Sequence, residues 1–172
     1  KSRLVTELKA YLRGLEEQEG WKNGRMEGRK GNLLQPSNLP AFHPLWLEGR
    51  CLSSGESVSY GPFIDILKSD FRFDVTDDGR RMAEKITAAV RDLLPEQADE
   101  ILPLFGNLLS VKLGPPWDER LQFVASEQIQ RQTFTALRDF FRASALKQPL
   151  VLVLEDLHWA DRLSLDLISL LM

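Results

Sequence analysis

Apolar residues recur along the chain with two different spacings. In the segments 2–17, 82–93, 98–109 and 126–147 they return every three or four positions, which predicts helices that each bury one face. After Asp161 the same spacing, in Leu165, Ile168, Leu171 and Met172, predicts a last helix. The run 150–154 is wholly apolar and rich in branched residues, which is typical of a buried strand, and 45–51 is a second predicted strand.

Capping residues and prolines set the predicted boundaries of the helices. Gly61-Pro62 opens a short helix, since proline is well tolerated in a first helical turn. Pro95 ends the helix before it, and Pro103 predicts a kink or a break in the next. Ser126 and Asp161 are the predicted caps of the two helices that follow them.

The order of these elements predicts an α/β fold. A helix, a strand, a mainly helical block (80–147), a strand and a helix are consistent with a parallel sheet flanked by helices. Residues 19–44 hold four glycines and three prolines, and we interpret them as an inserted surface loop, with a partner-binding loop as the alternative. Two strands alone are marginal in water, and both chain ends fall inside elements, so we expect 1–172 to be one partial domain truncated at both ends.

Composition excludes several classes of protein. With 43% hydrophobic and 27% charged residues, the chain has the composition of a soluble globular domain. A formal net charge of −3 gives no footprint for direct nucleic-acid binding, and no apolar run approaches the ~20 residues that cross a bilayer. The single Cys51 excludes an internal disulfide and suits a reducing compartment, so we expect a cytoplasmic protein without membrane contact.

Two polar pairs carry the candidate chemistry. Glu155 and Asp156 follow the apolar run 150–154 directly, and carboxylates at the end of a core strand call for a cation or a proton. Lys1-Ser2 opens the first predicted helix, as does the end of the phosphate-binding motif G-x-x-x-x-G-K-[ST]. The glycines of that motif would lie upstream of Lys1.

Four segments together resemble a known family. KSRLVTEL, WLEGRCLSSGESVSYGPFIDIL, TFTALRDFF and PLVLVLEDLHWADRLSLDLISLL are similar to the AAA/STAND-type P-loop ATPase module of bacterial signalling proteins. These modules are also described as origin-recognition-complex-like AAA ATPase domains. The resemblance runs from the first residue to the last, with a gap around 19–43.

The resemblance implies ATP and Mg²⁺ as cofactors and assigns roles to the two pairs. Lys1 would neutralise the β- and γ-phosphates, and Ser2 would ligate Mg²⁺. Glu155 would hold the metal, and Asp156 would orient or deprotonate the attacking water. The glutamate in the first position departs from the more common aspartate, which leaves open which acid does which.

The resemblance also implies partners. ATP and ADP would bias the module between two conformations, and other domains of the parent chain (a nucleotide cyclase, tetratricopeptide repeats or a helix-turn-helix) would supply the output. A homo-oligomer is a further expectation. The alternative is a degenerate, non-hydrolysing module that acts as a protein-interaction scaffold, and we expect the 172 residues alone to bind ATP poorly.

Some residues near these pairs keep two interpretations. His158 and Trp159 either pack the turn after the acids or take part in γ-phosphate sensing or a partner interface. Arg50, Glu56 and Tyr60 either approach nucleotide or a neighbouring subunit, or only stabilise a turn.

Overall fold

The computed structural model describes residues 3, 5–11, 44–51 and 59–172, in two compact units, Lys1–Leu45 and Trp46–Met172. In the first unit, residues 3 and 5–11 are helical, inside the predicted helix 2–17. An ion pair one turn apart, Arg3 Nε to Glu7 Oε1 at 2.7 Å, supports this helix. Lys1, Ser2, the end of the helix and the predicted insertion, except residue 44, lie outside the described residues.

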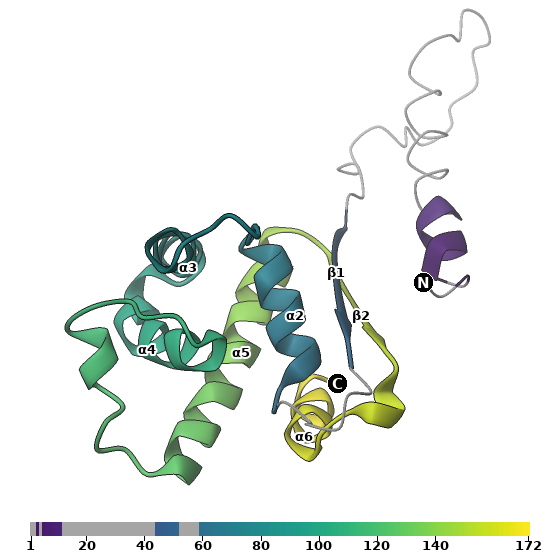
Figure 1. Ribbon diagram of the computed structural model, residues 1–172. Coiled ribbons are helices and arrows are strands. Elements are labelled where there is room, and N and C mark those ends of the chain that lie inside the picture. The colour runs from purple at the N-terminus through teal and green to yellow at the C-terminus, as the bar shows by residue number, and fades with distance from the viewer. Residues whose placement is uncertain (1–2, 4, 12–43, 52–58) are drawn as a thin grey trace, which may run out of the picture. The chain divides into compact units, whose positions relative to one another are not determined.

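Both predicted strands are confirmed and lie side by side. β1 (Leu45–Arg50) and β2 (Leu150–Glu155) form a two-stranded sheet in which the strands run the same way (Figure 1). The Cys51 N–H donates to the Glu155 carbonyl at 3.1 Å, so both strands end at the same edge. Every residue of β2 is half-buried against the described residues, so this strand is less buried than its apolar run predicts.

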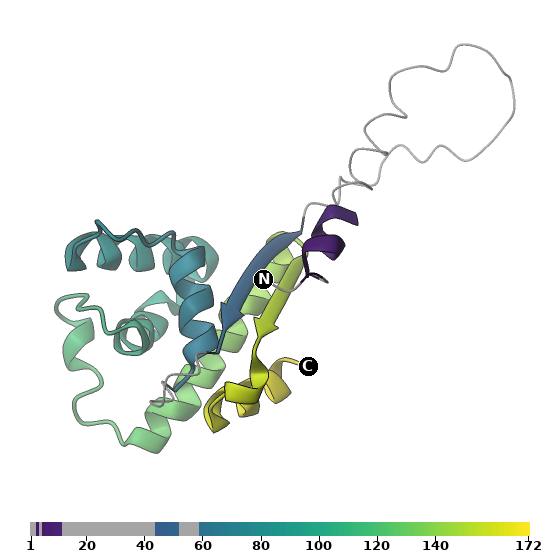
Figure 2. The same cartoon turned by 45° about the vertical axis from the view of Figure 1, so that its right-hand side comes forward.

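Helices make up most of the second unit. They are α2 (Gly61–Asp70), α3 (Gly79–Leu93), α4 (Ala98–Leu109), α5 (Ser126–Lys147) and α6 (Arg162–Leu171), with short 3₁₀ turns η2 (Pro95–Gln97), η3 (Trp117–Glu119) and η4 (Leu157–Trp159). The long α5 contacts β2, α4 and α6, and Figure 2 shows it behind the two strands. The second unit is thus a helix-rich arrangement with a small parallel sheet, consistent with an α/β fold of the P-loop NTPase kind. No helix in the described ranges is long and apolar enough to cross a membrane.

An aromatic cluster joins three of these helices. Phe140 of α5 meets Phe105 of α4 with ring centroids 5.4 Å apart, and Phe71, just after α2, at 5.7 Å. Both pairs are edge-to-face, the geometry that ring quadrupoles favour. Because Phe105 and Phe140 are completely buried, this cluster is the centre of the core.

Pro103 does not break its helix. α4 runs without interruption through Pro103, so the prediction of a break at this residue is wrong. Proline has no N–H, so the carbonyl of Asp99, four residues earlier, loses its usual helical partner. The Arg120 guanidinium donates to that carbonyl at 2.6 Å and replaces the missing bond.

One predicted helix cap and one predicted buried face need correction. Ser126 is the first residue of α5, Ala125 occupies the cap position, and no side chain among the described residues caps this helix. In α6 the fully buried residues are Ser164 and Leu167. Leu165 and Met172 of the predicted apolar stripe are 45% and 95% exposed. The remaining prediction, Asp161 as the cap of α6, is confirmed.

Candidate functional site

The two acids predicted from sequence lie at the carboxyl end of β2. Glu155 is the last residue of the strand, and its side chain is 19% exposed. Asp156 follows with φ 59° and ψ 38°, a left-handed conformation that aspartate tolerates better than most residues. The change of backbone direction leaves the Asp156 side chain 49% exposed, so the second acid is the more accessible to a ligand from solvent.

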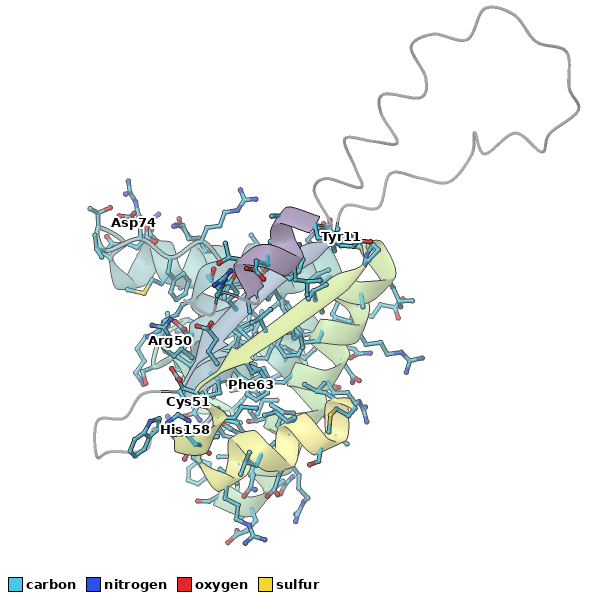
Figure 3. All side chains as sticks on the ribbon, turned by 90° about the vertical axis from the view of Figure 1, so that its right-hand side faces the viewer. Tyr11, Arg50, Cys51, Phe63, Asp74 and His158 are labelled. Carbon is cyan, nitrogen blue, oxygen red and sulfur yellow. The ribbon has the colours of Figure 1, made fainter. Side chains whose placement is uncertain are left out.

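Arg50, the last residue of β1, bridges both acids. Its Nη2 lies 2.8 Å from Glu155 Oε2, and its Nε lies 3.7 Å from Asp156 Oδ2. The hydrogen bond and the charge of Glu155 raise the pKa of the Arg50 guanidinium, and Asp156 and Asp65 add to this. Figure 3 shows Arg50, Cys51 and His158 gathered at this end of the sheet. The described chain thus supplies a cation of its own to the acidic pair.

The end of β1 is fixed against α2. A Cβ on Gly49 would lie 2.1 Å from the Pro62 carbonyl oxygen, so only glycine allows this approach. One turn later in α2, Asp65 Oδ2 accepts from the Arg50 N–H at 3.2 Å. These contacts fix the backbone from which the Arg50 side chain extends.

The loop after β2 has a second connection to the segment before α2. Asp161 accepts hydrogen bonds from the Ser164 N–H and hydroxyl, in its own helix, and from the Tyr60 N–H. Tyr60 has φ 64° and directly precedes α2. The carboxylate therefore joins the starts of two helices that are distant in sequence.

Cys51 lies beside the acids but is not suited to act as a nucleophile or a metal ligand. It is 4% exposed, and burial raises the pKa of its thiol, with smaller contributions from Asp161 and Asp156. A thiol of raised pKa stays protonated at neutral pH and is a poor nucleophile and metal ligand. Its role is therefore packing.

His158 and Trp159 are both exposed on η4, Trp159 to 50%. Their rings are 5.1 Å apart and tilted, so they contact each other. The interpretation that both side chains pack the turn is therefore not supported by burial, because both are exposed. A role toward nucleotide or a partner stays a prediction.

Glu155 and Asp156 could bind Mg²⁺ only together with further ligands. No group of three or more His, Cys, Asp or Glu residues within 3, 5–11, 44–51 and 59–172 could hold a metal alone. Magnesium commonly takes only one or two carboxylates and completes its shell with water and substrate phosphates. Glu155 and Asp156 match that pattern, so a metal here would need the phosphates of a nucleotide.

Of the four predicted site residues, the structure describes two. Glu155 and Asp156 are together, while Lys1 and Ser2 lie outside the described residues. Sequence reasoning left Arg50 out of the site and assigned Asp161 only a capping role. A signal for Arg50 was present, because it ends a strand parallel to β2 and parallel strands bring their carboxyl ends to one edge.

A family comparison adds to this geometry. Residues 32–172, most of the chain, match the model of the AAA ATPase domain family. The chain belongs to the AAA ATPase domain family. Membership indicates a nucleotide-binding ATPase, and nucleotides bind such open α/β sheets at the carboxyl ends of the strands, where Arg50, Glu155 and Asp156 lie. The searches of curated proteins and of solved structures found no match.

Proposed function

We propose that this AAA ATPase domain is the ATP-binding and ATP-hydrolysing switch of a multidomain signalling or regulatory protein. The observation that carries the proposal is the acidic pair at the end of β2, charge-paired with Arg50 of the neighbouring strand. Two adjacent carboxylates at this edge of the sheet are what a P-loop ATPase needs for its metal and its attacking water. The match to the family supports the same conclusion.

The two acids differ in environment, and this difference supports the division of roles. Glu155, with its side chain mostly buried, is the proposed Mg²⁺ ligand. Asp156, half exposed, is the proposed group that orients the attacking water or takes its proton. When bound, Mg²⁺ would neutralise charge on the β- and γ-phosphates. Lys1 and Ser2 are proposed to contact the phosphates and the metal, as their resemblance to the phosphate-binding motif implies.

Arg50 gives the proposed switch a resting state. The Arg50 guanidinium compensates the charge of both acids. A divalent cation held by Glu155 would compete with the guanidinium for the same carboxylate. Binding of Mg-nucleotide would therefore separate the Arg50–Glu155 pair, and the bound and free states would differ at the end of β1 as well as β2.

The regulatory part of the proposal follows from this difference. A ligand shifts a two-state equilibrium only as far as its affinities for the two states differ. ATP and ADP would act in this way on the domain, hydrolysis would reset it, and attached domains would give the output. The protein is proposed to act in the cytoplasm.

The experiment compares ATP turnover by the full-length protein with that of Asp156→Asn. We expect the variant to lose about 100-fold or more in kcat, because a positioned general base contributes at least that much. Nucleotide affinity should be nearly unchanged. The matched control is Asp166→Asn, at an exposed position of α6. Equal turnover by the protein and its Asp156→Asn variant would refute this role of Asp156.

A second function is favoured by two observations. The Arg50 pairs and the glutamate in the first acidic position would also suit a domain that binds partners, or nucleotide without hydrolysis. In that case the full-length protein would bind Mg-ATP or its partner but show no turnover above an Asp156→Asn background.

A further inference from the structure

The segment between the acidic pair and α6 is held at both of its ends by the same part of the chain. At its start, the Cys51 N–H donates to the Glu155 carbonyl at 3.1 Å. At its end, the Tyr60 N–H donates to Asp161 Oδ2 at 3.1 Å. Cys51 follows β1 directly and Tyr60 precedes α2 directly, so Asp156 lies between two hydrogen bonds to the β1–α2 region.

The two carboxylate oxygens of Asp161 accept hydrogen bonds from different groups. Oδ1 accepts from the Ser164 N–H at 3.1 Å, which is an ordinary N-cap bond for α6. Oδ2 accepts from the Tyr60 N–H, 101 positions earlier, and from the Ser164 hydroxyl. Capping needs only one acceptor oxygen, so the bond to Tyr60 serves something else.

The Tyr60 side of this bond is firmly packed. The residue is 7% exposed, and its ring meets Phe134 of α5 edge-to-face, with centroids 5.7 Å apart. Its backbone then continues into α2, where Phe63 and Ile66 are completely buried. Asp161 is therefore bonded to a part of the backbone that the core holds in place.

The segment itself is short and internally bonded. The Trp159 N–H donates to the Asp156 carbonyl at 2.9 Å, and the Ala160 N–H to the Leu157 carbonyl at 3.0 Å. A turn of this kind moves as a unit, so fixing its last residue also fixes the left-handed backbone of Asp156.

We propose that Asp161 is a positioning residue for the acidic pair: through its bond to the Tyr60 N–H it fixes the direction in which the Asp156 carboxylate points. The proposal rests on the proposed function, in which Asp156 acts on the attacking water. Misplacing a reacting group by about 1 Å can cost about 100-fold in rate, so the bond affects kcat more than binding.

The decisive variant is Asp161→Asn in the full-length protein. Asparagine caps helices about as well as aspartate, so its amide oxygen can keep the bond to the Ser164 N–H. The second oxygen becomes an NH₂ group, which cannot accept from the Tyr60 N–H or the Ser164 hydroxyl but can donate to that hydroxyl. The substitution therefore removes the bond between the segments and leaves the cap in place.

Two measurements then test the proposal. Hydrogen exchange should become faster at the Tyr60 amide and stay slow at the Ser164 amide. In ATP turnover, kcat should fall about tenfold or more while KM for Mg-ATP stays within about twofold. Tyr60→Phe is the matched control: it keeps the N–H and the ring and removes a buried hydroxyl that has no hydrogen-bond partner among the described residues, so both readouts should match the unmodified protein.

The possible failures are distinguishable. Unchanged kcat in Asp161→Asn, unchanged exchange at Tyr60, or an equal loss of kcat in Tyr60→Phe would each overturn this proposal and leave the proposed function standing. An unmodified protein without ATP turnover would overturn the hydrolytic function, and this proposal with it.

Discussion

Different interactions hold together the aromatic core of the helices and the charged end of the sheet. Around Phe140, buried rings meet at centroid distances of 5.4 and 5.7 Å. Around Arg50, charged groups with side chains 19–49% exposed hold one another across 2.8 and 3.7 Å. The rings of the first region are buried, and the charged side chains of the second are partly exposed to solvent.

The difference separates stability from chemistry. Burial of apolar rings contributes several kcal/mol per residue, while exposed ion pairs contribute little because water and salt screen them. Arg50, Glu155 and Asp156 therefore add little to folding, and their partners can change at small cost. A ligand-responsive site needs that freedom, and the core supplies the stability that the site does not.

The largest effect is expected in the core. Phe140→Ala should lower the free energy of unfolding by about 3–5 kcal/mol, since it removes a fully buried ring and leaves a cavity. Denaturant unfolding measures this. Phe123→Ala is the matched control, because that ring is 98% exposed and should cost almost nothing. Similar losses in the two variants would show that the aromatic cluster is not the centre of stability.

The contact between β1 and α2 should be the next most sensitive. Gly49→Ala puts a methyl group 2.1 Å from the Pro62 carbonyl oxygen, so α2 must move. We expect a loss of about 1–3 kcal/mol in unfolding free energy, as for other overpacked sites. In Gly61→Ala, no atom of the described residues lies within 4 Å of the added methyl, and stability should be retained. A Gly49→Ala variant as stable as Gly61→Ala would contradict the close approach.

The smallest effect is expected at the charged end. Arg50→Gln should tighten Mn²⁺ binding by the full-length protein, with a non-hydrolysable ATP analogue present, by about two- to fivefold at low salt, the range of an exposed ion pair. The gain should shrink as salt is added, because screening weakens the competing guanidinium. Arg80→Gln breaks an exposed pair on α3 and should leave Mn²⁺ binding unchanged. Weaker binding in Arg50→Gln would mean that the guanidinium does not compete with the metal.

Local patterns predicted the elements and the acids well. Apolar spacing located both strands and the helices of the second unit, and the abrupt end of the run 150–154 pointed to Glu155 and Asp156. These features depend on neighbours in sequence. The predicted cap Asp161 is of the same kind, since its cap bond reaches only three residues ahead.

The predictions that were wrong or incomplete concern features that depend on residues distant in sequence. At Pro103 the Arg120 side chain from another segment replaces the missing hydrogen bond, and the buried face of α6 depends on the helices it packs against. The Arg50–Glu155 pair joins residues 105 positions apart. No local pattern contains these three contacts, and the pairing of β1 with β2 creates the last of them.

In the proposed function, Glu155 and Asp156 receive the metal of a bound nucleotide. The most direct measurement is Mn²⁺ affinity of the full-length protein, by electron paramagnetic resonance, with a non-hydrolysable ATP analogue present. Glu155→Gln keeps an acceptor for Arg50 but loses the charge, and we predict at least about tenfold weaker Mn²⁺ binding. Glu127→Gln, at the exposed start of α5, should bind as the unmodified protein does. Equal Mn²⁺ affinity in Glu155→Gln and the unmodified protein would contradict the account.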